Sequence, residues 1–390
     1  MAHSYAKKSI ALNEGVDIHD DLSRNVFGVL GVPIDAIGMS DLVEKIEISA
    51  LVKSPYLIST PNLNFIVQSL TDEQFRESLL RSNVCVADGA PIVWVAYLMG
   101  IPVMERVAGS DIFDALKALP QRITGFLFGG QPGVAAAAAK SLNSQRSGML
   151  CIGSHFPGFG AIEEMSDEPT IDLINASNAQ FLVVSLGAAK GQAWLLRNHE
   201  RLKIPVRAHL GAALNFQGGT LKRAPTFVRR SGLEWLWRIK EEPKLWTRYF
   251  RDGCIFLSLL AVPVLPYALA ATWQRRASAS KDGQLRAVIG DSPRATSVSL
   301  GGAATIANVQ EATSWFRTAL NRRKDVWLDL SAVTRIDSRF IGLCLMLRKQ
   351  LKEQGRELYF TGVGFRVRLF LRAHRFGFLL KRPGVIVPTP

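Results

Sequence analysis

Residues 180–211, QFLVVSLGAAKGQAWLLRNHERLKIPVRAHLG, contain one complete strand–helix–strand pattern. The continuous apolar run QFLVVSLG is typical of a strand buried on both faces, and GQAWLLRNHERL has the spacing of an amphipathic helix. PVRAHLG then reads as the next strand. Two strands joined through a helix are the repeating unit of a parallel sheet, so this stretch predicts an α/β fold.

The same alternation extends outward to cover residues 26–219. Further apolar runs are VFGVLGVPI (26–34), PYLIST (55–60), NVCVAD (83–88), GFLFGG (125–130) and GMLCIG (148–153). Stretches of helical period, such as SDLVEKIEISALV and GSDIFDALKAL, lie between them. Because ligands bind at the carboxyl ends of strands in such sheets, we expect the loops after these runs to carry the chemistry.

The composition bounds the kind of protein. With 390 residues the chain is long enough for two domains, and its 48% hydrophobic content is enough for packed cores. It carries 47 lysines and arginines against 33 acidic residues, a formal net charge of +14. Such an excess predicts attraction to an anionic partner, which is nucleic acid, phospholipid or a phosphorylated substrate.

The cysteines and the N-terminus indicate a reducing, intracellular location. Cys85, Cys151, Cys254 and Cys344 are far apart and form no CxxC pair, which argues against structural zinc and a disulfide framework. Residues 1–25 are polar and contain no apolar signal-peptide core, so we expect a flexible tail there.

A basic, aromatic stretch precedes a long apolar run. Residues 222–251 hold nine Lys or Arg and three Trp, and residues 253–273 carry no charge. The run is long enough to span a bilayer, but Pro263 and Pro266 would kink or break a helix. Because basic residues flank both ends, a hairpin dipping into the membrane from the cytoplasm is the first interpretation. A single span is the second, and a buried helix the third.

A second, smaller α/β unit is expected at the end of the chain. Strand candidates such as VWLDLS and ELYFTG alternate with helix candidates such as FIGLCLMLRKQLKEQ. The expected organisation is a tail over residues 1–25, an α/β domain over 26–252, a membrane-associating segment with a linker over 253–283, and a small α/β domain over 284–384.

Polar clusters follow several predicted strands. Asp88, followed by Gly89, stands at a strand end, where its carboxylate could take a proton from an attacking hydroxyl, although Asp-Gly is also a common turn pair. Gly129 and Gly130 precede a helix and would let a diphosphate approach its N-terminus, or they form an ordinary turn. Asp111 could cap the helix that follows it.

Seven motifs occur in a fixed order: TPNLNF, VADGAP, ERVAGSD, FLFGGQPGVA, SLGAAKGQ, HLGAALNFQGGTLKRAP and LEWLWRIKEEPKLWTRY. Over residues 26–251 the series resembles the WecG/TagA/CpsF family of bacterial glycosyltransferases. The resemblance implies a Rossmann-like domain with a basic, membrane-facing appendage. It also implies inverting transfer of a hexosyl or N-acetylhexosaminyl group from a UDP-sugar to a polyprenyl-diphosphate-linked sugar. No bound metal or other cofactor is expected.

The resemblance assigns roles by position. The expected catalytic residues are Asp88 as general base, with Thr60, Asn62 and Arg106. The expected substrate-binding residues are Asp111, Gly129, Gly130, Lys190, Gln192 and Asn215, and the expected lipid-diphosphate contacts are Arg223, Arg238 and Arg248. Two places depart from the family pattern: Gly191 and Gln192 replace the usual Gln and Glu, and Asn215 replaces the usual Asp. These changes bear on the donor's identity more than on the reaction.

The C-terminal unit resembles a STAS domain through VWLDLSAVTRIDSRFIGLCLMLRKQLKEQGRELYFTGV (326–363). Regulatory members have a phosphoacceptor Ser or Thr where this chain has Arg339, and a glycine where it has Phe340. The resemblance therefore implies docking without a phosphorylation switch. We expect Arg339 to favour an anionic partner surface or lipid headgroups, Ser338 to cap a helix, and residues 284–390 to be dispensable for transfer itself.

Taken together, the sequence predicts a cell-envelope or exopolysaccharide glycosyltransferase at the cytoplasmic face of the bacterial inner membrane. Its expected partners are a UDP-sugar, a lipid-linked acceptor, the membrane surface and a protein bound by the STAS-like domain. The alternative is a degenerate transferase core that acts as a regulatory scaffold. A nucleic-acid binder is disfavoured because the basic cluster adjoins an apolar run, and a nicotinamide dehydrogenase because GxGxxG is missing.

Overall fold

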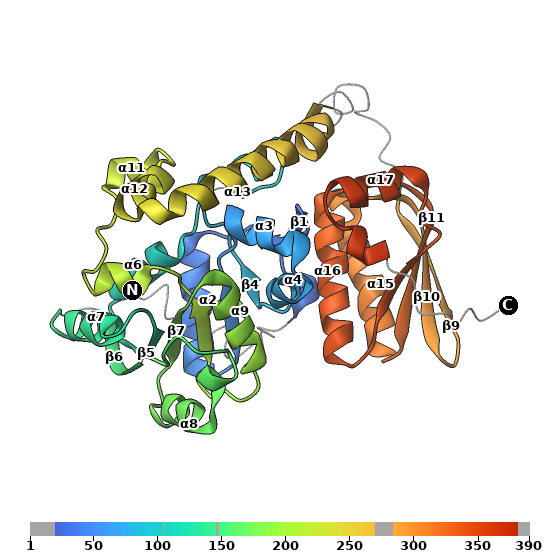
Figure 1. Ribbon diagram of the computed structural model, residues 1–390. Coiled ribbons are helices and arrows are strands. Elements are labelled where there is room, and N and C mark those ends of the chain that lie inside the picture. Colours follow the sequence, from blue (N-terminus) through green and yellow to red (C-terminus); the bar gives the residue numbers. More distant parts are fainter. Residues whose placement is uncertain (1–19, 104, 146–147, 270–283, 381–390) are drawn as a thin grey trace.

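The computed structural model describes residues 20–103, 105–145, 148–269 and 284–380 (Figure 1). Most of the expected N-terminal tail and the spacer after the apolar run lie outside these ranges. The described chain contains a six-stranded sheet, a four-stranded sheet and a two-stranded hairpin. The predicted α/β class, with a smaller second α/β domain, is confirmed.

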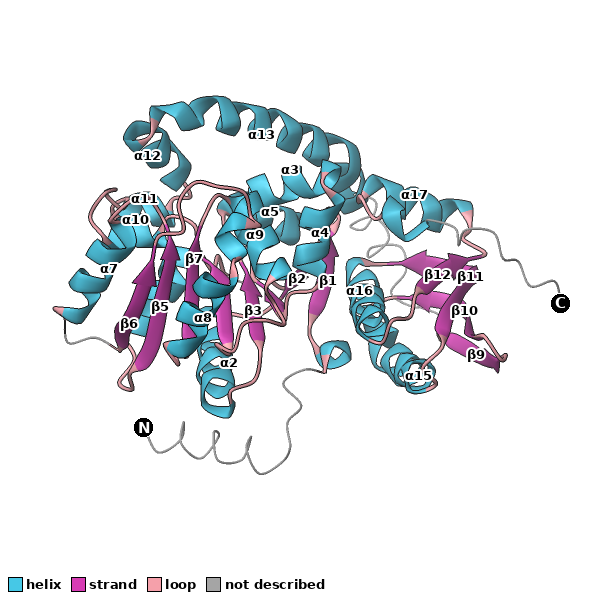
Figure 2. Cartoon of the chain, turned by 60° about the horizontal axis from the view of Figure 1, so that its bottom comes forward, coloured by secondary structure: helices cyan, strands magenta, loops and turns pink. Residues whose placement is uncertain are grey.

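The six-stranded sheet is parallel throughout, in the order β4-β3-β8-β7-β5-β6. Its strands are β3 (Tyr56–Ser59), β4 (Val84–Cys85), β5 (Ile123–Gly129), β6 (Met149–His155), β7 (Phe181–Ser185) and β8 (Val206–His209). Every residue of β3, β4, β7 and β8 is buried, as their apolar sequences predict. Helices lie on both sides of this sheet (Figure 2).

Two apolar cores flank the sheet. One joins it to α2 (Met39–Val52), α6 (Gly109–Lys117), α7 (Val134–Asn143) and α10 (Ala213–Gln217). The other joins it to α8 (Glu168–Ala176) and α9 (Ala188–Arg197), where Trp194 is fully buried. A third core contains α3 (Leu63–Thr71), α4 (Glu73–Leu80) and α5 (Ala90–Leu98).

The run at residues 26–34 does not enter the parallel sheet. It forms a separate antiparallel hairpin of β1 (Val26–Val29) and β2 (Val32–Asp35). Its two turn residues, Leu30 and Gly31, both have positive φ, 47° and 91°. Positive φ at both turn residues suits the strand twist of a hairpin with a two-residue loop. For Leu30 this backbone conformation carries an energetic cost, whereas glycine adopts it readily.

After the sheet the chain forms α11 (Thr226–Arg230), α12 (Glu234–Glu241) and α13 (Trp246–Leu259). We call these helices, together with the continuation of α13 to Leu269, the appendage. From α13 the helix continues through a π-helical turn, Leu260–Val264, to Leu269. The predicted hairpin is therefore wrong for the described residues. Pro263, which has no backbone N–H to donate, lies within the wider π turn. The helix therefore continues past the proline and does not turn back.

This helix lies across the N-terminal α/β domain toward the C-terminal domain (Figure 1). Phe256, Leu259 and Val264 are buried in the core that holds α3 and α5. By length and apolar composition the helical stretch Pro243–Leu269 could also cross a bilayer, and only 28% of its most apolar window is buried.

The C-terminal domain has a four-stranded sheet in the order β12-β11-β10-β9. Its strands are β9 (Arg286–Asp291), β10 (Ala295–Ala304), β11 (Asp325–Ile336) and β12 (Leu358–Thr361), and its helices are α15 (Val309–Asn321), α16 (Ser338–Glu353) and α17 (Phe365–Ala373). Twelve of the sixteen residues of α16 are buried, because the helix lies between its own sheet and the N-terminal α/β domain (Figure 1).

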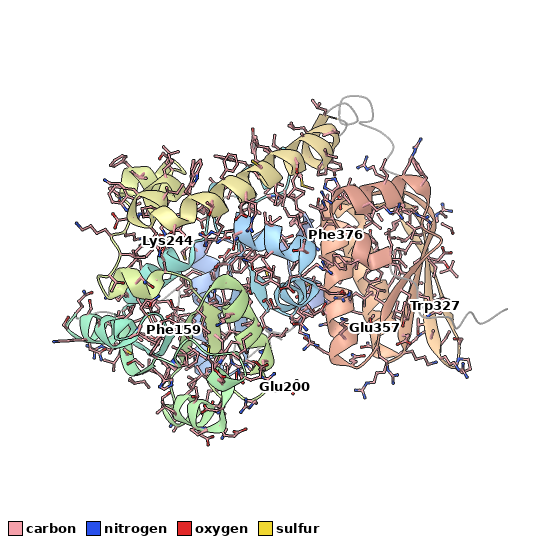
Figure 3. The ribbon with its side chains drawn as sticks, in the orientation of Figure 1. Phe159, Glu200, Lys244, Trp327, Glu357 and Phe376 are labelled. Carbon is pink, nitrogen blue, oxygen red and sulfur yellow. The ribbon has the colours of Figure 1, made fainter. Side chains whose placement is uncertain are left out.

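The contact between the domains is close enough to require glycine on both sides. A Cβ on Gly28 of β1 would lie 2.6 Å from Cγ2 of Ile341, and one on Gly342 would overlap the carbonyl oxygen of Val26. Leu22 and Val26 belong to the same apolar core as α16. Phe376 lies at this boundary (Figure 3), 2.8 Å from where a Cβ of Gly28 would be.

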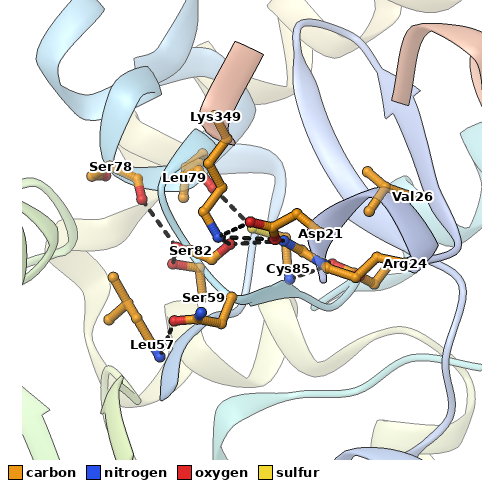
Figure 4. A network of polar contacts seen from close by, with 12 residues as sticks. Asp21, Arg24, Val26, Leu57, Ser59, Ser78, Leu79, Ser82, Cys85 and Lys349 are labelled. Carbon is orange, nitrogen blue, oxygen red and sulfur yellow. Dashed lines mark hydrogen bonds and ion pairs between the residues drawn. The ribbon is translucent and has the colours of Figure 1, made fainter. Parts of the chain in front are cut away.

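A chain of buried charges crosses the boundary (Figure 4). Lys349 of α16 donates to Asp21 at 2.9 Å, and Asp21 also accepts from Arg24 at 2.5 Å. Arg24 in turn donates to both oxygens of Asp35, at 3.1 and 2.8 Å. The paired carboxylates raise the pKa of Arg24, although burial opposes them. Each charge is matched by a neighbour, so the network depends on both domains.

The expected roles of Arg339 and Ser338 are corrected by the structure. Arg339 is buried and donates to the carbonyl oxygens of Val26 (3.2 Å) and Arg24 (3.1 Å), so it does not face an external anionic partner. The helix cap is Asp337, whose Oδ1 accepts from the Phe340 amide at 2.9 Å. Because truncation at residue 284 would leave Asp21 without Lys349 and expose β1, we no longer expect the C-terminal domain to be dispensable.

The domain contact is tested by replacing Gly342 with alanine. The added methyl group has no room against β1, and overpacking of this kind costs about 1–3 kcal/mol. We expect a lower melting temperature and faster proteolysis between the domains. Gly364→Ala is the matched control, because nothing lies within 4 Å of its added Cβ. Equal melting of the two variants would contradict the close contact.

Candidate active site

Two loops meet at the carboxyl ends of β3 and β4. The Asp88 amide donates to the Pro61 carbonyl oxygen at 2.8 Å, which joins the Thr60–Asn62 loop to the Asp88–Gly89 loop. Gly89 has a φ of 117°, a conformation that favours glycine, and its Cβ position lies 3.9 Å from Cβ of Asn62. Thr60 is buried, and Asn62 caps α3 by accepting from the Phe65 amide at 3.2 Å. The structure therefore brings Thr60, Asn62 and Asp88 together.

Asp88 has an unusual protonation equilibrium. Burial of its carboxyl group raises its pKa to about 7, and the negative charges of Glu234 and Asp111 act in the same direction. The positive charge of Arg106 and the Gly109 amide oppose the shift without cancelling it. A carboxylate with a pKa near neutrality is well matched to accept a proton from a hydroxyl group.

Arg106 connects Asp88 to the appendage. Its guanidinium donates to Asp111 of α6 at 2.8 Å and to Glu234 of α12 at 2.5 Å. These partners raise the pKa of Arg106, so it stays charged beside Asp88. Asp111 also pairs with Arg223 and with Arg229, the latter at 3.1 Å. One carboxylate thus holds three arginines from separate parts of the chain.

The three arginines expected to contact a lipid diphosphate lie in or next to the appendage, with different partners. Arg223 is paired with Asp111 and Asp114 and also donates to Ser110. Arg238 pairs with Glu242 and lies 5.6 Å from the Phe216 ring centroid. Arg248 lies over the Tyr249 ring at 5.1 Å, and its buried Nε has no hydrogen-bond partner among the described residues.

The sequence analysis missed two residues near Asp88. Glu234 binds Arg106, and Tyr249 has a pKa raised mainly by burial, with a smaller contribution from the charge of Asp88. Both lie in the motif LEWLWRIKEEPKLWTRY, in which only Arg238 and Arg248 were expected to contact a ligand. Within the described ranges, no group of three or more His, Cys, Asp or Glu side chains is arranged to hold a metal ion.

A second group of predicted residues lies at the ends of β5 and β7. Gly129 and Gly130 have φ values of 100° and 83°, and a Cβ on Gly129 would lie 2.6 Å from the Ser185 carbonyl oxygen. That oxygen already accepts from the Gly130 amide at 2.7 Å. The glycines thus let two strand ends approach closely. Lys190 is exposed at the start of α9 and donates to the Gly160 carbonyl oxygen at 2.9 Å.

Gln192 is not where a substrate contact would be. Its side chain is fully buried and exchanges hydrogen bonds with Ser59, at 3.0 and 3.3 Å, so the expected substrate role is corrected to a core role. Beside it, a Cβ on Gly191 would overlap the ring of His209. His209 forms a hydrogen bond with the Leu186 carbonyl oxygen at 2.6 Å, which holds its ring in this place. Glycine at position 191 therefore leaves the room that the ring needs. Asn215 is partly exposed on α10, after β8.

Comparison with known proteins identifies both parts of the chain. Residues 27–268 match the model of the Glycosyl transferase WecG/TagA/CpsF family, and residues 289–381 match the STAS domain model Mlab. Two relatives are the N-acetylglucosaminyldiphosphoundecaprenol N-acetyl-beta-D-mannosaminyltransferases of Staphylococcus aureus strains MW2 and NCTC 8325 / PS 47. Each is 25% identical over 248 residues, which cover 62% of this chain and 91% of the relative.

Among solved structures, the murine Slc26a9 anion transporter in its inward-facing state aligns with 46% of this chain and 32% of its own. The sequence identity is 15% and the TM-score is 0.17. A score this low carries no information about fold or function.

The raised pKa of Asp88 predicts how stability depends on pH. An unfolded aspartate titrates near pH 4, so between about pH 4 and pH 7 the folded chain binds this proton more tightly than the unfolded chain. Asp88 therefore lowers the free energy of unfolding as pH rises through this range, by at most about 1.4 kcal/mol per pH unit, the value for one proton.

The measurement is urea unfolding of the wild type and of Asp88→Asn at pH values from about 5 to about 8. The variant should gain stability relative to the wild type up to about pH 7, after which the difference should be constant. A difference that does not change with pH would show that the carboxyl group titrates normally.

Proposed function

This chain belongs to the WecG/TagA/CpsF family of glycosyltransferases, and on that premise we propose that it transfers a sugar from a UDP-sugar to a polyprenyl-diphosphate-linked sugar. The family match supports the reaction class, and the two relatives' names support a lipid-diphosphate acceptor and an N-acetylhexosamine as the group transferred. The observation that carries the proposal is Asp88, at the carboxyl end of β4 with a pKa of about 7.

In the proposed step the acceptor hydroxyl oxygen attacks the anomeric carbon of the donor sugar. Asp88 takes the proton from that hydroxyl, the new carbon–oxygen bond forms, and the bond to the UDP oxygen breaks. UDP leaves with the electron pair, and attack from the opposite face inverts the anomeric centre. The raised pKa of Asp88 keeps its ionisation near neutral pH, where the ionised carboxylate can act as this base.

The acceptor diphosphate would lie beneath the appendage. Arg248 and Arg238 reach this region from α13 and α12, and their guanidinium groups suit phosphate oxygens. Arg223 forms ion pairs with two aspartates of α6. To bind a phosphate it would have to give up one of these ion pairs; if it keeps both, its role is to position α6. Gly129, Gly130, Lys190 and Asn215, at the other strand ends, are the proposed donor side.

The appendage also supports placement at the cytoplasmic face of the inner membrane, in cell-envelope or exopolysaccharide assembly. Large apolar side chains are exposed along it and on the neighbouring α5, where Trp and Tyr are typical of a bilayer interface. The exposed set is Trp94, Tyr97, Phe227, Leu233, Trp235, Leu236, Trp246, Phe250, Leu257, Val262, Leu265 and Leu269. Burial of these side chains in lipid would remove an apolar surface that water otherwise contacts.

The alternative of a degenerate scaffold is supported less well. Gly191, one of the two departures from the family pattern, has a packing explanation. The ring of His209 occupies the space that a side chain at this position would need. The face of the C-terminal domain expected to receive a partner is occupied by β1 of the same chain. The remaining departure, Asn215, does not touch the Asp88 cluster through any described hydrogen bond or ion pair, and it bears on the donor.

The catalytic assignment is tested by Asp88→Asn. Loss of the base should lower transfer from a UDP-sugar to a prenyl-diphosphate-linked sugar by roughly 10²–10⁴-fold, with UDP binding retained. In the wild type kcat/KM should rise with pH and level off above about pH 7, and the variant should lack this limb. Glu200→Gln is the control, since Glu200 lies far from the appendage (Figure 3). Near-normal turnover of Asp88→Asn would refute the assignment.

Membrane association is tested by exposed substitutions that spare the core. Leu257, Val262 and Leu269 are 65%, 70% and 68% exposed, and we expect their joint replacement by serine to weaken vesicle binding more than tenfold, because each buried leucine contributes about 1.5–3 kcal/mol. The matched control replaces Leu51 and Leu173, which are exposed on α2 and α8. Co-sedimentation with vesicles is the measurement, and equal binding by both variants would exclude the appendage as the anchor.

A further inference from the structure

Helix α17 of the C-terminal domain carries an exposed surface that the proposed function does not use. Phe365 is 80% exposed and Leu369 is 56% exposed, and they are one helical turn apart. Arg368 and Arg372 lie on the same side of the helix, and both are exposed. Their neighbours Arg366 and Arg375 are exposed as well. No acidic residue occurs between positions 362 and 380, so the surface combines apolar and purely basic groups.

Within the part of the chain that the structure describes, no ion pair neutralises this surface. Arg368 donates to the Val363 carbonyl oxygen at 3.2 Å, and among the described residues no carboxylate forms an ion pair with Arg366, Arg368 or Arg372. The buried side of the helix holds Val367 and Leu371 in the domain core. The exposed side therefore points away from that core, with its positive charges available.

The position of α17 is fixed relative to the apolar helix of the appendage. The Tyr267 ring, near the end of that helix, packs edge-on against Phe370 at 5.5 Å and His374 at 5.1 Å between centroids. Both helices lie on the same side of the molecule in two views (Figures 1 and 2). Tyr267 contacts the side of α17 that holds Phe370 and His374, which fixes the orientation of this helix. The opposite side, with Phe365 and Leu369, stays exposed.

We propose that α17 is a second membrane-contact element, which binds anionic phospholipid headgroups through Arg368 and Arg372 and inserts Phe365 and Leu369 between them. The inference rests on the proposed membrane association of the appendage and adds a contact from the other domain. A bilayer fits better than nucleic acid or an acidic protein, because bulky apolar side chains at the centre of a basic face match a surface with phosphates above hydrocarbon.

The chain offers a matched control for the charges. Arg323 and Arg356 are exposed, and each lies two residues before the start of its strand, β11 or β12. Because these neighbouring strands are parallel, both arginines lie at their amino ends. Helix α17 follows the carboxyl end of β12, at the opposite end of the domain. Glu357, next to Arg356, lies far from α17 in Figure 3. Replacing either pair of arginines by glutamate changes the net charge equally.

The experiment measures co-sedimentation of the full-length protein with vesicles of phosphatidylcholine, alone or with about 30% phosphatidylglycerol. Arg368→Glu with Arg372→Glu should lower the partition coefficient on anionic vesicles at least tenfold, since each basic residue near such a surface contributes about fivefold. Arg323→Glu with Arg356→Glu should change it less than threefold. Phe365→Ser should weaken binding to both vesicle types, whereas Val288→Ser, equally exposed on β9, should not.

Melting temperatures and transfer to a water-soluble acceptor analogue should be unchanged in all four variants, because none of these residues is in the proposed site. Equal vesicle binding by the α17 and control pairs would overturn the inference, and so would loss of binding to a polyanion such as RNA with vesicle binding retained. If the wild type itself does not bind vesicles, the proposed membrane association fails first, and the two failures are thereby distinguished.

Discussion

The buried carboxylate of Asp35 is the constraint on which both domains depend. It accepts from the guanidinium of Arg24 and from the Cys85 amide at 2.7 Å, and it is only 4% exposed. A buried charge without its partner costs about 3–5 kcal/mol, so Arg24 must stay where it is. Arg24 then requires Asp21, and Asp21 requires Lys349 of the C-terminal domain. Satisfying one carboxylate therefore fixes how the two domains dock.

The carboxylate of Asp35 is also connected to the candidate active site, through the backbone of β4. Cys85 ends β4, and Asp88 follows three residues later, with its amide held by the Pro61 carbonyl oxygen. From the opposite direction Asp111 gathers arginines from the core and the appendage around Asp88. The Asp88 carboxyl group thus lies between two sets of compensated charges, and burial raises its pKa, with smaller contributions from the charges of Glu234 and Asp111.

The sequence predicted the strand–helix alternation because buried parallel strands leave a continuous apolar signal. The roles expected for Asp88, Thr60 and Asn62 came from the family resemblance, and the structure brings these residues together because strand ends converge. Three features depended on contacts remote in sequence and could not be predicted. Gln192 is in the core because Ser59, 133 residues away, bonds it. Arg339 is internal because β1 supplies carbonyl oxygens. The helix through Pro263 continues because α3 packs against α13 and α5 packs against the π turn.

A lipid-linked acceptor places a geometric demand on an enzyme of this kind. Its diphosphate is confined to the headgroup layer, so the proposed base, Asp88, would have to lie at a set depth and orientation beneath the surface. A single amphipathic helix fixes depth but leaves the protein free to roll about the helix axis. A second contact on a rigidly docked domain removes that freedom, and two weak contacts on one body bind far more tightly than either alone. The closeness of α16 to β1, which excludes any side chain at Gly342, makes the C-terminal domain rigid enough to provide such a contact.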